Sequence, residues 1–448
     1  MRDVKSVLRY KKIGIMGLAR SGIAAAKKLK SLGLDVFLSD SSPIERFINA
    51  DELLTLGECE FGGHTERLLT NYLLIVSPGI DQASPMLLKA KSMGITLWSE
   101  IELGYRLTHK DTKIIAITGS NGKSTTSSLI AHILKKKGYD TVLGGNIGDA
   151  YCSFDIENKH DFIILEISSF QLDLIDSFHP NIASILNITP DHLDRYPSYE
   201  DYARSKFRIV KNLTAEDVFV YNADCETTKH ILNGEILSVD AKNTLCKNFR
   251  KFSLADKTDY SFDSLPLKGP HNHANILAAL LCVKDFIDLK NIYDTLMTFP
   301  PLEHRLEPVS THDGVEYIND SKATNTDSVR YALQSFTKPI HLILGGSDKG
   351  EDFSVLDSYL SGKVKKLYLI GETADKLEST FKDKYIYEKF TDFESTIKAT
   401  IKGAISGEIV LLSPACASFD WFKNFEHRGK EFKRIVIALT TTNKGDIS

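Results

Sequence analysis

One run of residues constrains the fold of this chain more than any other. Residues 114–117 are apolar and mostly β-branched, which favours a buried β-strand, and a turn with the sequence Gly119-Ser120-Asn121-Gly122-Lys123-Ser124 follows shortly. Residues 127–134 then have the apolar spacing of a helix whose N-terminus faces the turn. This order predicts a phosphate-binding loop, because free backbone N–H groups and the positive end of a helix attract anionic oxygens.

The side chains of the turn suit the same chemistry. Lys123 supplies a mobile positive charge for the outer phosphates of a nucleotide, and the hydroxyl of Ser124 or Thr125 can bind Mg²⁺. Ile117 stands where the usual phosphate-loop pattern has its first glycine, so we interpret the run as a shortened variant. An ordinary strand-turn-helix with a chance Gly-Lys-Ser is the alternative.

Length and composition bound the remaining possibilities. A chain of 448 residues predicts about three domains. A net charge of −4 gives no reason to expect nucleic-acid or membrane binding, and no apolar run reaches the roughly 18 residues that span a bilayer. The six cysteines lack CxxC spacing, which favours reduced thiols over a zinc site or disulfides. We therefore expect a cytoplasmic protein, without a secretory signal, that acts as a monomer.

Short apolar runs alternate with helical patterns along the whole chain, which predicts an α/β fold with three domains. We expect a Rossmann-like N-terminal domain, a central P-loop ATPase-type domain with a parallel or mixed sheet, and a Rossmann-like C-terminal domain. The linkers are predicted near residues 98–112 and at the Pro300-Pro301 pair. The domains would then cover residues 1–98, 99–301 and 302–448.

The first domain carries a glycine pattern of ambiguous meaning. Gly17 and Gly22 follow a predicted strand and open a helix, and Asp40 ends the next strand, as in the dinucleotide-binding fingerprint. Ala19 stands where the middle glycine normally lets the backbone touch a pyrophosphate, which weakens an NAD-binding interpretation. Close packing of a helix on a strand explains the two glycines equally well. A loosely bound nucleotide-bearing substrate is the third possibility.

Three further residues in the central segment are considered for metal binding or catalysis. Glu166 ends a predicted buried strand, at the edge of a parallel sheet where ligands bind, and could reach Mg²⁺ at the phosphate loop. His192 lies in a polar cluster and could be a metal ligand, an acid or base, or a structural residue. Lys206 falls in a helix predicted over residues 198–213, where spacing alone indicates a solvated surface lysine.

Taken together, these motifs resemble the muramyl ligases, ATP-dependent enzymes that build the peptide of bacterial peptidoglycan. The run Thr118 to Lys123 is similar to the Thr-Gly-x-Asn-Gly-Lys loop of that family. The resemblance implies that Lys123, His192 and Lys206 are catalytic and that Lys206 is N-carbamylated. A carbamate would turn this cation into a ligand of the carboxylate type for a second Mg²⁺. The implied metal ligands are Ser124, Glu166, His192 and the carbamate of Lys206.

The resemblance also implies residues for ATP. The phosphate loop would hold the phosphates, Arg305 would reach them from the third domain, Asp320 would contact the ribose, and Asn272 and Asn275 would contact adenine. The implied ATP-binding residues are Gly119, Ser120, Asn121, Gly122, Lys123, Ser124, Thr125, Asn272, Asn275, Arg305 and Asp320.

The third domain is similar to that of the family members that add D-glutamate. The similarity lies in three segments, Asn319 to Asn325, Leu344 to Gly350 and Ser413 to Phe425. The implied ligands of the D-glutamate carboxylates are Lys322, Thr324, Lys349 and Ser418, with Phe419 and Phe425 lining the pocket. Lysines and hydroxyl groups suit a dicarboxylate.

The N-terminal domain would hold the uridine nucleotide of UDP-N-acetylmuramoyl-L-alanine. The implied contacts are Leu18, Ala19 and Arg20 along the diphosphate, Asp40, Ser41 and Ser42 near uracil, Gly79 below it, and Asn146 from the central domain. The implied reaction joins D-glutamate to this substrate through an acyl phosphate, in peptidoglycan precursor synthesis and hence in cell shape and division. The alternatives are a sister amide ligase with another amino acid and a non-catalytic ATP- or NAD-binding protein.

Overall fold

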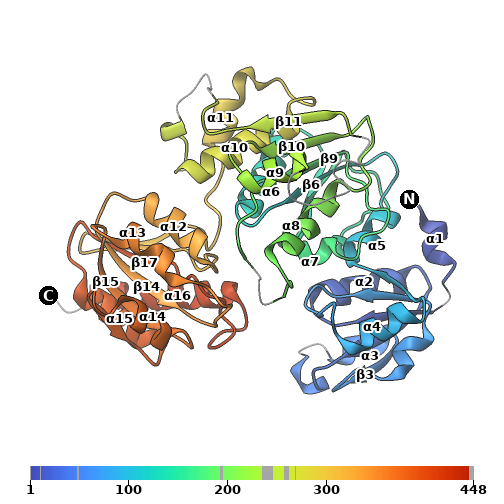
Figure 1. The fold of residues 1–448 in the computed structure, drawn as a ribbon, viewed down its shortest axis with the longest axis horizontal. Helices are drawn as coiled ribbons and strands as arrows, with labels where there is room; N and C mark the ends of the chain where they lie inside the picture. The colour runs from blue at the N-terminus through green and yellow to red at the C-terminus, as the bar shows by residue number, and fades with distance from the viewer. Residues whose placement is uncertain are drawn as a thin grey trace. The chain divides into compact units, whose positions relative to one another are not determined.

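The computed structural model describes residues 2–10, 12–47, 50–191, 195–234, 246–256, 262–267 and 269–442. The fold is α/β with three separate sheets (Figure 1). The chain divides into two compact units. The first is built mainly from residues up to 297 and contains two of the sheets, and the second is built mainly from residues 298 onward. Within the described residues, no helix is both long and apolar enough to cross a membrane.

The first sheet is wholly parallel, with the strand order β3-β2-β1-β4-β5. Its strands are β1 (Lys12–Met16), β2 (Asp35–Asp40), β3 (Glu58–Phe61), β4 (Leu73–Val76) and β5 (Thr96–Trp98). Helix α2 (Arg20–Ser31) packs on one face, and helix α4 (Pro85–Ser92) packs on the other. Two further helices belong to this part of the chain, α1 (Val4–Leu8) and α3 (Ala50–Leu56).

Strand β4 shows why the apolar runs of this domain predict its strands. Leu73 and Ile75 join the core under α2, whereas Leu74 and Val76 join the core under α4. Side chains alternate between the two faces of a strand, so a strand covered on both faces needs apolar residues at consecutive positions.

The second sheet is also wholly parallel, with the order β11-β10-β9-β6-β8-β7. Its strands are β6 (Lys113–Thr118), β7 (Thr141–Gly145), β8 (Phe162–Glu166), β9 (Ile182–Ile185), β10 (Val218–Asn222) and β11 (Asn248–Phe252). The helices that accompany it are α6 (Lys123–Lys136), α7 (Ser169–Leu172), α8 (Tyr199–Phe207), α9 (Glu226–Asn233), α10 (Pro270–Val283) and α11 (Ile292–Met297). Strand β6 lies inside the sheet and leads directly into the phosphate loop and α6 (Figure 1).

The segment predicted as the first linker folds into a helix, α5 (Glu100–Leu107), and every residue of this helix is buried. Ser99 caps the helix by accepting a hydrogen bond from the backbone N–H of Glu102. Ile101 and Leu103 belong to a core that also includes residues of α2 and of the second sheet. The connection is therefore a packed element of the first unit.

The third sheet is mixed, with the order β12-β13-β17-β14-β15-β16. Its strands are β12 (Glu307–His312), β13 (Val315–Asn319), β14 (Ile340–Gly345), β15 (Val364–Ile370), β16 (Tyr387–Lys389) and β17 (Ile409–Leu412). Only β12 runs antiparallel to its neighbour, through a tight turn at Asp313 and Gly314, whose φ angles are 49° and 77°. The predicted Rossmann-like C-terminal domain is therefore present, with one antiparallel strand added at the edge of its sheet.

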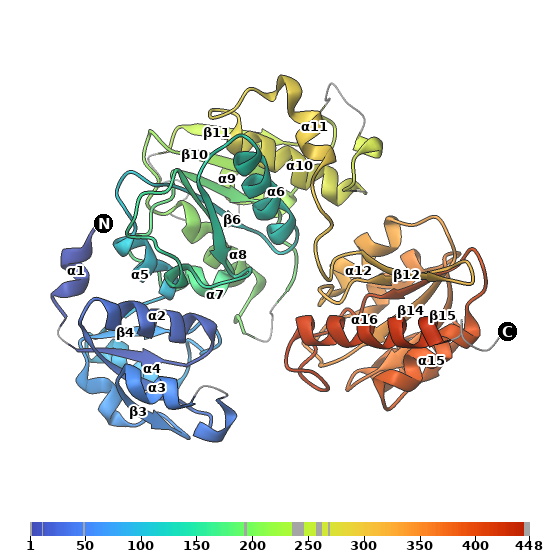
Figure 2. The ribbon, with the colours of Figure 1, turned by 180° about the vertical axis from the view of Figure 1, so that it is seen from behind.

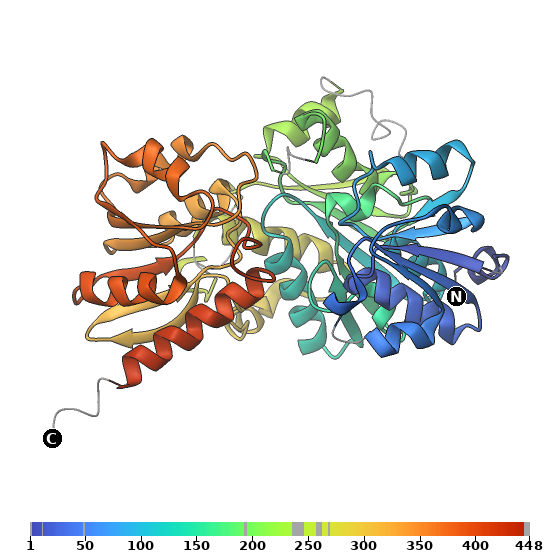
Figure 3. The ribbon, with the colours of Figure 1, turned by 90° about the horizontal axis from the view of Figure 1, so that it is seen from below.

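Helices cover both faces of the third sheet. The helices α12 (Thr326–Gln334), α13 (Asp357–Leu360) and α14 (Ala374–Phe381) contribute to the core on one face. The helices α15 (Phe393–Gly403) and α16 (Phe425–Thr442) contribute to the core on the other. Figures 2 and 3 show α16 running along its face of the sheet.

Candidate functional site

The phosphate loop has the backbone that its glycines predict. Gly119 and Gly122 have φ angles of 153° and 84°, and Gly122 precedes the first residue of α6. A Cβ atom on Gly122 would lie 2.2 Å from the Oδ1 atom of Asn275, so a larger residue could not occupy this position without displacing its neighbour. The helix begins at Lys123, four residues earlier than the helical pattern indicated.

Hydrogen bonds hold the loop in shape from two directions. The Nζ of Lys123 donates to the carbonyl oxygens of Gly119 and Ser120, each at 2.8 Å. The backbone N–H of Asn121 donates to the Oδ1 of Asn187 at 2.8 Å, and the side-chain amide of Asn187 donates back to the Asn121 carbonyl at 3.0 Å. Asn187 thus fixes a loop residue, a role that the sequence analysis did not assign to it.

Glu166 is the centre of the polar contacts beside the loop. This carboxylate is 1% exposed, and its Oε2 accepts a hydrogen bond from the Ser124 hydroxyl at 2.6 Å. Its Oε1 accepts from the side-chain amide of Asn146 at 2.7 Å, and its carbonyl accepts from the Asn146 backbone N–H at 2.8 Å. Three residues predicted separately, Ser124, Asn146 and Glu166, therefore meet at the carboxyl ends of β6, β7 and β8.

Lys206 is buried, with 2% of its surface exposed, so the interpretation of this residue as a solvated surface lysine is wrong. It lies in helix α8, which ends at Phe207, and not in one helix reaching residue 213. Its Nζ donates to the Gly119 carbonyl at 2.9 Å and lies 4.5 Å from the centre of the Tyr202 ring. The amine thus contacts the phosphate loop directly.

Asn272 and Asn275 also lie beside the loop. Both are buried in α10, and the side-chain amide of Asn275 donates to the Oδ1 of Asn272 at 3.1 Å. The hydroxyl of Thr126, in the first turn of α6, donates to the Oδ1 of Asn275 at 3.3 Å. His192, which we predicted as a metal ligand and catalytic residue, lies outside the described residues.

The N-terminal sheet gathers its predicted residues at the carboxyl ends of β1, β2 and β4. The Asp40 carboxylate accepts hydrogen bonds from the backbone N–H groups of Leu18 at 2.6 Å and Ser42 at 2.7 Å. Ser41 is exposed between them. Gly79 follows β4, and its carbonyl accepts a hydrogen bond from the guanidinium of Arg195, a residue that the sequence analysis did not single out.

The glycines at this edge have packing roles. Gly17 has a φ of 88°, and a Cβ on Gly22 would lie 2.0 Å from the Gly17 carbonyl oxygen. Ala19 occupies the N-cap position of α2, but its side chain makes no hydrogen bond to the first backbone N–H groups of the helix. The Arg20 guanidinium donates to the Gly148 carbonyl at 2.8 Å, which ties the start of α2 to the loop that carries Asn146.

In the second unit, Arg305 lies in an unusual stretch of backbone that is hydrogen-bonded to Asp320, because the backbone N–H of Leu306 donates to the Asp320 carboxylate at 3.2 Å. Burial raises the pKa of Asp320 to about 7, although Arg305 and a hydrogen bond from Ser413 oppose the shift. His304 and Leu306, on either side of Arg305, have φ angles of 62° and 43°. Such angles are costly for residues with side chains and tend to occur at functional sites.

The residues predicted for D-glutamate follow the carboxyl ends of β13, β14 and β17. The Nζ of Lys322 lies 5.2 Å from the centre of the Phe425 ring. Ser347 and Ala417 form an isolated antiparallel bridge, which joins the loop carrying Lys349 to the loop carrying Ser418. Of the remaining members, Thr324 is half-buried and Phe419 is 74% exposed.

A buried arginine under these loops was missed by the sequence analysis. Arg428 of α16 is 1% exposed, and burial lowers the pKa of its guanidinium to about 10. It donates to the carbonyl oxygens of Ser321, Cys416 and Ala417 at 2.9 to 3.1 Å and to the hydroxyl of Ser321 at 3.0 Å. Its place in an amphipathic helix gave no signal of these contacts.

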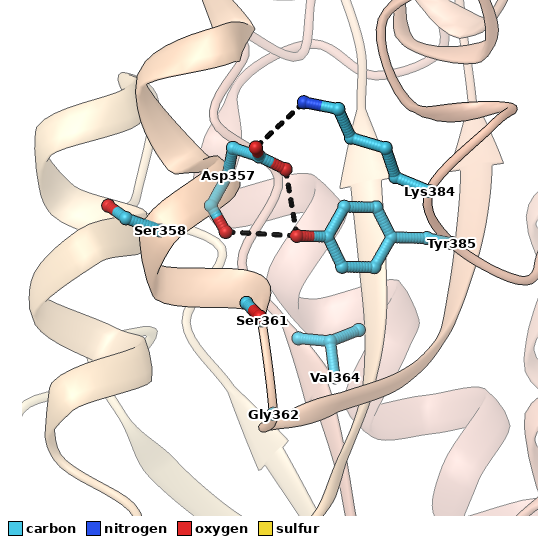
Figure 4. A pocket seen from close by; sticks show the side chains of 7 residues that line it. All are labelled: Asp357, Ser358, Ser361, Gly362, Val364, Lys384 and Tyr385. Carbon is cyan, nitrogen blue, oxygen red and sulfur yellow. Dashed lines mark hydrogen bonds and ion pairs between the residues drawn. The ribbon is translucent and has the colours of Figure 1, made fainter.

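A surface hollow of about 570 Å³ lies elsewhere on the same unit (Figure 4). It is lined by Asp357, Ser358, Ser361, Gly362, Val364, Lys384 and Tyr385. Val364 begins β15, so the hollow lies at the amino end of this strand. The predicted ligand residues follow the carboxyl ends of the strands, so the hollow is not part of the candidate site.

The residues beside the phosphate loop fit a nucleotide with Mg²⁺. A buried carboxylate and a hydroxyl, Glu166 and Ser124, face each other at 2.6 Å, and both are oxygen ligands of the kind that Mg²⁺ accepts. In the second unit, the Nε of Arg305 is buried without a hydrogen-bond partner among the described residues.

Family models match three successive parts of the chain. Residues 11–99 match the Mur ligase MurD-like N-terminal domain, residues 117–283 the Mur ligase middle domain, and residues 304–416 the Mur ligase glutamate ligase domain. A protein of Cytophaga hutchinsonii named UDP-N-acetylmuramoylalanine--D-glutamate ligase is 42% identical over 448 residues, covering 96% of this chain and 99% of the relative. The chain belongs to the Mur ligase family.

Other Mur ligases of the same name are similar over comparable lengths. The protein of Koribacter versatilis is 39% identical, covering 98% of this chain and 99% of its own, and that of Clostridioides difficile is 38% identical, covering 96% and 99%.

Solved structures share the fold. The UDP-N-acetylmuramate-alanine ligase of Thermotoga maritima has a TM-score of 0.62 at 20% identity and covers 96% of this chain and 99% of its own. A folylpolyglutamate synthase/dihydrofolate synthase of Yersinia pestis, complexed with AMPPNP and Mn, has a TM-score of 0.55 at 18% identity, covering 76% and 92%.

Proposed function

We propose that this chain is an ATP-dependent ligase that joins the amine of D-glutamate to the L-alanyl carboxylate of UDP-N-acetylmuramoyl-L-alanine. The observation that carries the proposal is the similarity, along nearly the whole chain, to relatives named for this activity. In this proposal, residues 1–98 bind the uridine nucleotide, residues 99–301 bind ATP, and residues 302–448 bind D-glutamate. We further propose that the enzyme acts in the cytoplasm, as a monomer.

The reaction needs an activated carboxylate, because an amine does not displace oxide from a carboxylate in water. An oxygen of the L-alanyl carboxylate attacks the γ-phosphorus of ATP, which forms an acyl phosphate and releases ADP. The D-glutamate amine then attacks the acyl carbon, which forms the amide and releases phosphate. Lys123 neutralises charge on the transferred phosphoryl group, and the backbone N–H groups after Gly122 hold the phosphates in line.

When bound, Mg²⁺ would supply positive charge against the phosphates of ATP. We propose that Ser124 and Glu166 hold one ion and that His192 and a carbamate on Lys206 hold a second. The buried amine of Lys206, 2.9 Å from the Gly119 carbonyl, supports the assignment of Lys206 to this site. The two lysines Lys322 and Lys349 orient the D-glutamate carboxylates by charge-assisted hydrogen bonds.

The first experiment measures ADP release by the purified chain with each substrate omitted in turn. We expect release only when ATP, UDP-N-acetylmuramoyl-L-alanine, D-glutamate and Mg²⁺ are all present. Turnover with another amino acid in place of D-glutamate would identify a sister ligase. ADP release that never depends on an amino acid would contradict the proposal.

A second experiment tests the acyl phosphate. When the L-alanyl carboxylate carries ¹⁸O, the oxygen that attacks phosphorus must leave with the phosphate, so one ¹⁸O atom should appear in each phosphate released. Mass spectrometry of the phosphate reads this transfer directly. Unlabelled phosphate accompanied by full amide formation would exclude this route.

A further inference from the structure

The N-terminal domain contains a hydrogen-bonded histidine beside the residues predicted for the uracil ring. Ser39 of β2 and Glu60 of β3 are paired in register across two parallel strands. The Ser39 hydroxyl donates to the Oε1 of Glu60 at 2.6 Å, and it also lies 2.7 Å from the Nδ1 of His64. Thr65 completes the group, since its backbone N–H donates to the Glu60 carboxylate at 3.1 Å.

The loop before His64 places this side chain next to the predicted uracil segment. The backbone N–H of Gly62 donates to the Ser42 carbonyl at 3.0 Å, and that of Gly63 donates to the Asp40 carbonyl at 3.2 Å. The φ angles of these glycines are 78° and 151°, so this turn suits residues without a Cβ. His64 therefore follows a loop that is hydrogen-bonded to both ends of the segment Asp40 to Ser42.

The hydrogen bonds define which ring nitrogen of His64 carries the proton. Burial opposes ionisation of Glu60, but hydrogen bonds from Ser39 and Thr65 hold the pKa of this carboxyl below its ordinary value. An ionised carboxylate cannot donate, so the single proton of the Ser39 hydroxyl points to Glu60. The contact with His64 then requires Nδ1–H as the donor and the Ser39 oxygen as the acceptor.

A neutral imidazole with its proton on Nδ1 has a bare acceptor at Nε2. Burial lowers the pKa of His64, although the nearby Asp40 and Glu60 carboxylates oppose the shift, so the ring is neutral at pH 7.5. Nε2 has no hydrogen-bond partner among the described residues, and the side chain is only half-buried. The network thus leaves Nε2 of His64 as a hydrogen-bond acceptor in a residue next to the segment predicted to bind uracil.

We propose that His64 is a specificity-determining residue for the nucleotide base, and that its Nε2 accepts a hydrogen bond from the N3–H of uracil. The inference rests on the proposed function, which brings a uridine nucleotide to this domain. Uracil donates from N3, whereas cytosine has an acceptor there, so a bare Nε2 favours uracil over cytosine. Ser39 and Glu60 are positioning residues, because they select the tautomer without contacting the base.

The experiment measures binding of UDP and of 3-methyluridine 5′-diphosphate to the full chain by titration calorimetry at pH 7.5. We expect wild type to bind UDP at least 10-fold more tightly than the methylated analogue, which has no N3–H. His64→Ala should weaken UDP binding about 3- to 12-fold, the value of one neutral hydrogen bond, and leave binding of the analogue unchanged.

Two substitutions separate the role of the acceptor from that of the fold. His64→Gln can place its amide oxygen near the position of Nε2 and should retain most of the discrimination, whereas His64→Asn can replace only Nδ1 and should lose it. His312→Ala, in the second unit, is the control for loss of a histidine and should bind both nucleotides as wild type does.

The pH dependence gives an independent measurement. Burial holds the pKa of His64 below its ordinary value, and as the pH falls through this pKa, Nε2 gains a proton and becomes a donor that faces another donor. UDP binding should therefore weaken more at low pH in wild type than in His64→Gln, in which the terminal phosphate of UDP still titrates but the base contact does not. Equal affinity of wild type for UDP and the methylated analogue, or an unchanged preference in His64→Ala, would overturn the assignment of His64. A wild-type chain that binds no UDP would overturn the proposed function itself.

Discussion

Two glutamates of helix α5 lead to opposite predictions for the same substitution. Glu100 and Glu102 are 1% and 0% exposed. Glu100 accepts a hydrogen bond from the backbone N–H of Cys152, but its Oε2 has no partner among the described residues. Glu102 accepts from the Nε of Arg106 at 2.6 Å and from the backbone N–H groups of residues 176–178. Hydrogen bonds therefore offset little of the cost of burying the Glu100 carboxylate but most of the cost of burying the Glu102 carboxylate.

Burial raises the pKa of Glu100 from 4.5 to about 7, although the hydrogen bond from Cys152 opposes the shift. The folded state therefore holds this proton more tightly than the unfolded state, and the free energy of unfolding falls as the pH rises from 4.5 to 7. At about 1.4 kcal/mol per pKa unit, the loss is about 1 kcal/mol at pH 5 and about 3 kcal/mol at pH 8.

Glu100→Gln keeps the shape of the side chain and removes its ionisation, so it should recover most of this loss. By differential scanning calorimetry we expect the unfolding transition of the first unit to rise by roughly 4 to 8 °C at pH 8 and by much less at pH 5. Glu102→Gln is the matched substitution and should lower the transition at both pH values, because it removes the buried carboxylate that accepts from the Nε of Arg106 and from the backbone N–H groups of residues 176–178, while Asp3 and Asp176 still pair with Arg106. A Glu100→Gln variant that is equally stabilised at pH 5 and pH 8, or destabilised at pH 8, would refute the reasoning.

The proposed active site gives three further predictions. Lys123→Ala should abolish phosphoryl transfer with circular dichroism unchanged, and near-normal ADP release would contradict the phosphate-loop assignment; Lys136→Ala on the same helix is the control. Lys206→Ala should be nearly inactive and partly rescued by small carboxylic acids, whereas full activity without them would rule out the carbamate. Lys349→Ala should raise the Michaelis constant for D-glutamate about 10- to 100-fold and leave that for ATP unchanged in substrate titrations, with Lys366→Ala as the control. An equal effect on both substrates would disprove its role in D-glutamate binding.

The sequence predicts most strands of this fold because the sheets are covered on both faces. A strand between two layers of helices must be apolar at consecutive positions, and the uninterrupted apolar runs of residues 73–76 and 409–412 form β4 and β17. Strand β12 is harder to recognise, since it lies at an edge and its residues are mostly half-exposed. The Asp313-Gly314 pair is a hairpin signal that the sequence analysis did not use.

The candidate site likewise contains residues that could be predicted from the sequence and residues that could not. The phosphate loop is local in sequence, so its residues could be predicted from one run. The burial of Lys206 could not, because its amine contacts the carbonyl of Gly119, 87 residues earlier in the chain. Arg428 and His64 were missed for a similar reason, since their partners belong to other strands and loops.

The bond between Arg20 and Gly148 has a thermodynamic consequence. Arg20 begins the helix proposed for the diphosphate, while Asn146 in the same loop as Gly148 donates to the carboxylate of Glu166. A ligand that draws the Arg20 guanidinium away from the Gly148 carbonyl would release one end of this loop, and a metal ion that takes Glu166 from Asn146 would release the other. If the loop responds as a unit, the two ligands change each other's affinity by one common factor, and the order in which they bind cannot alter that factor.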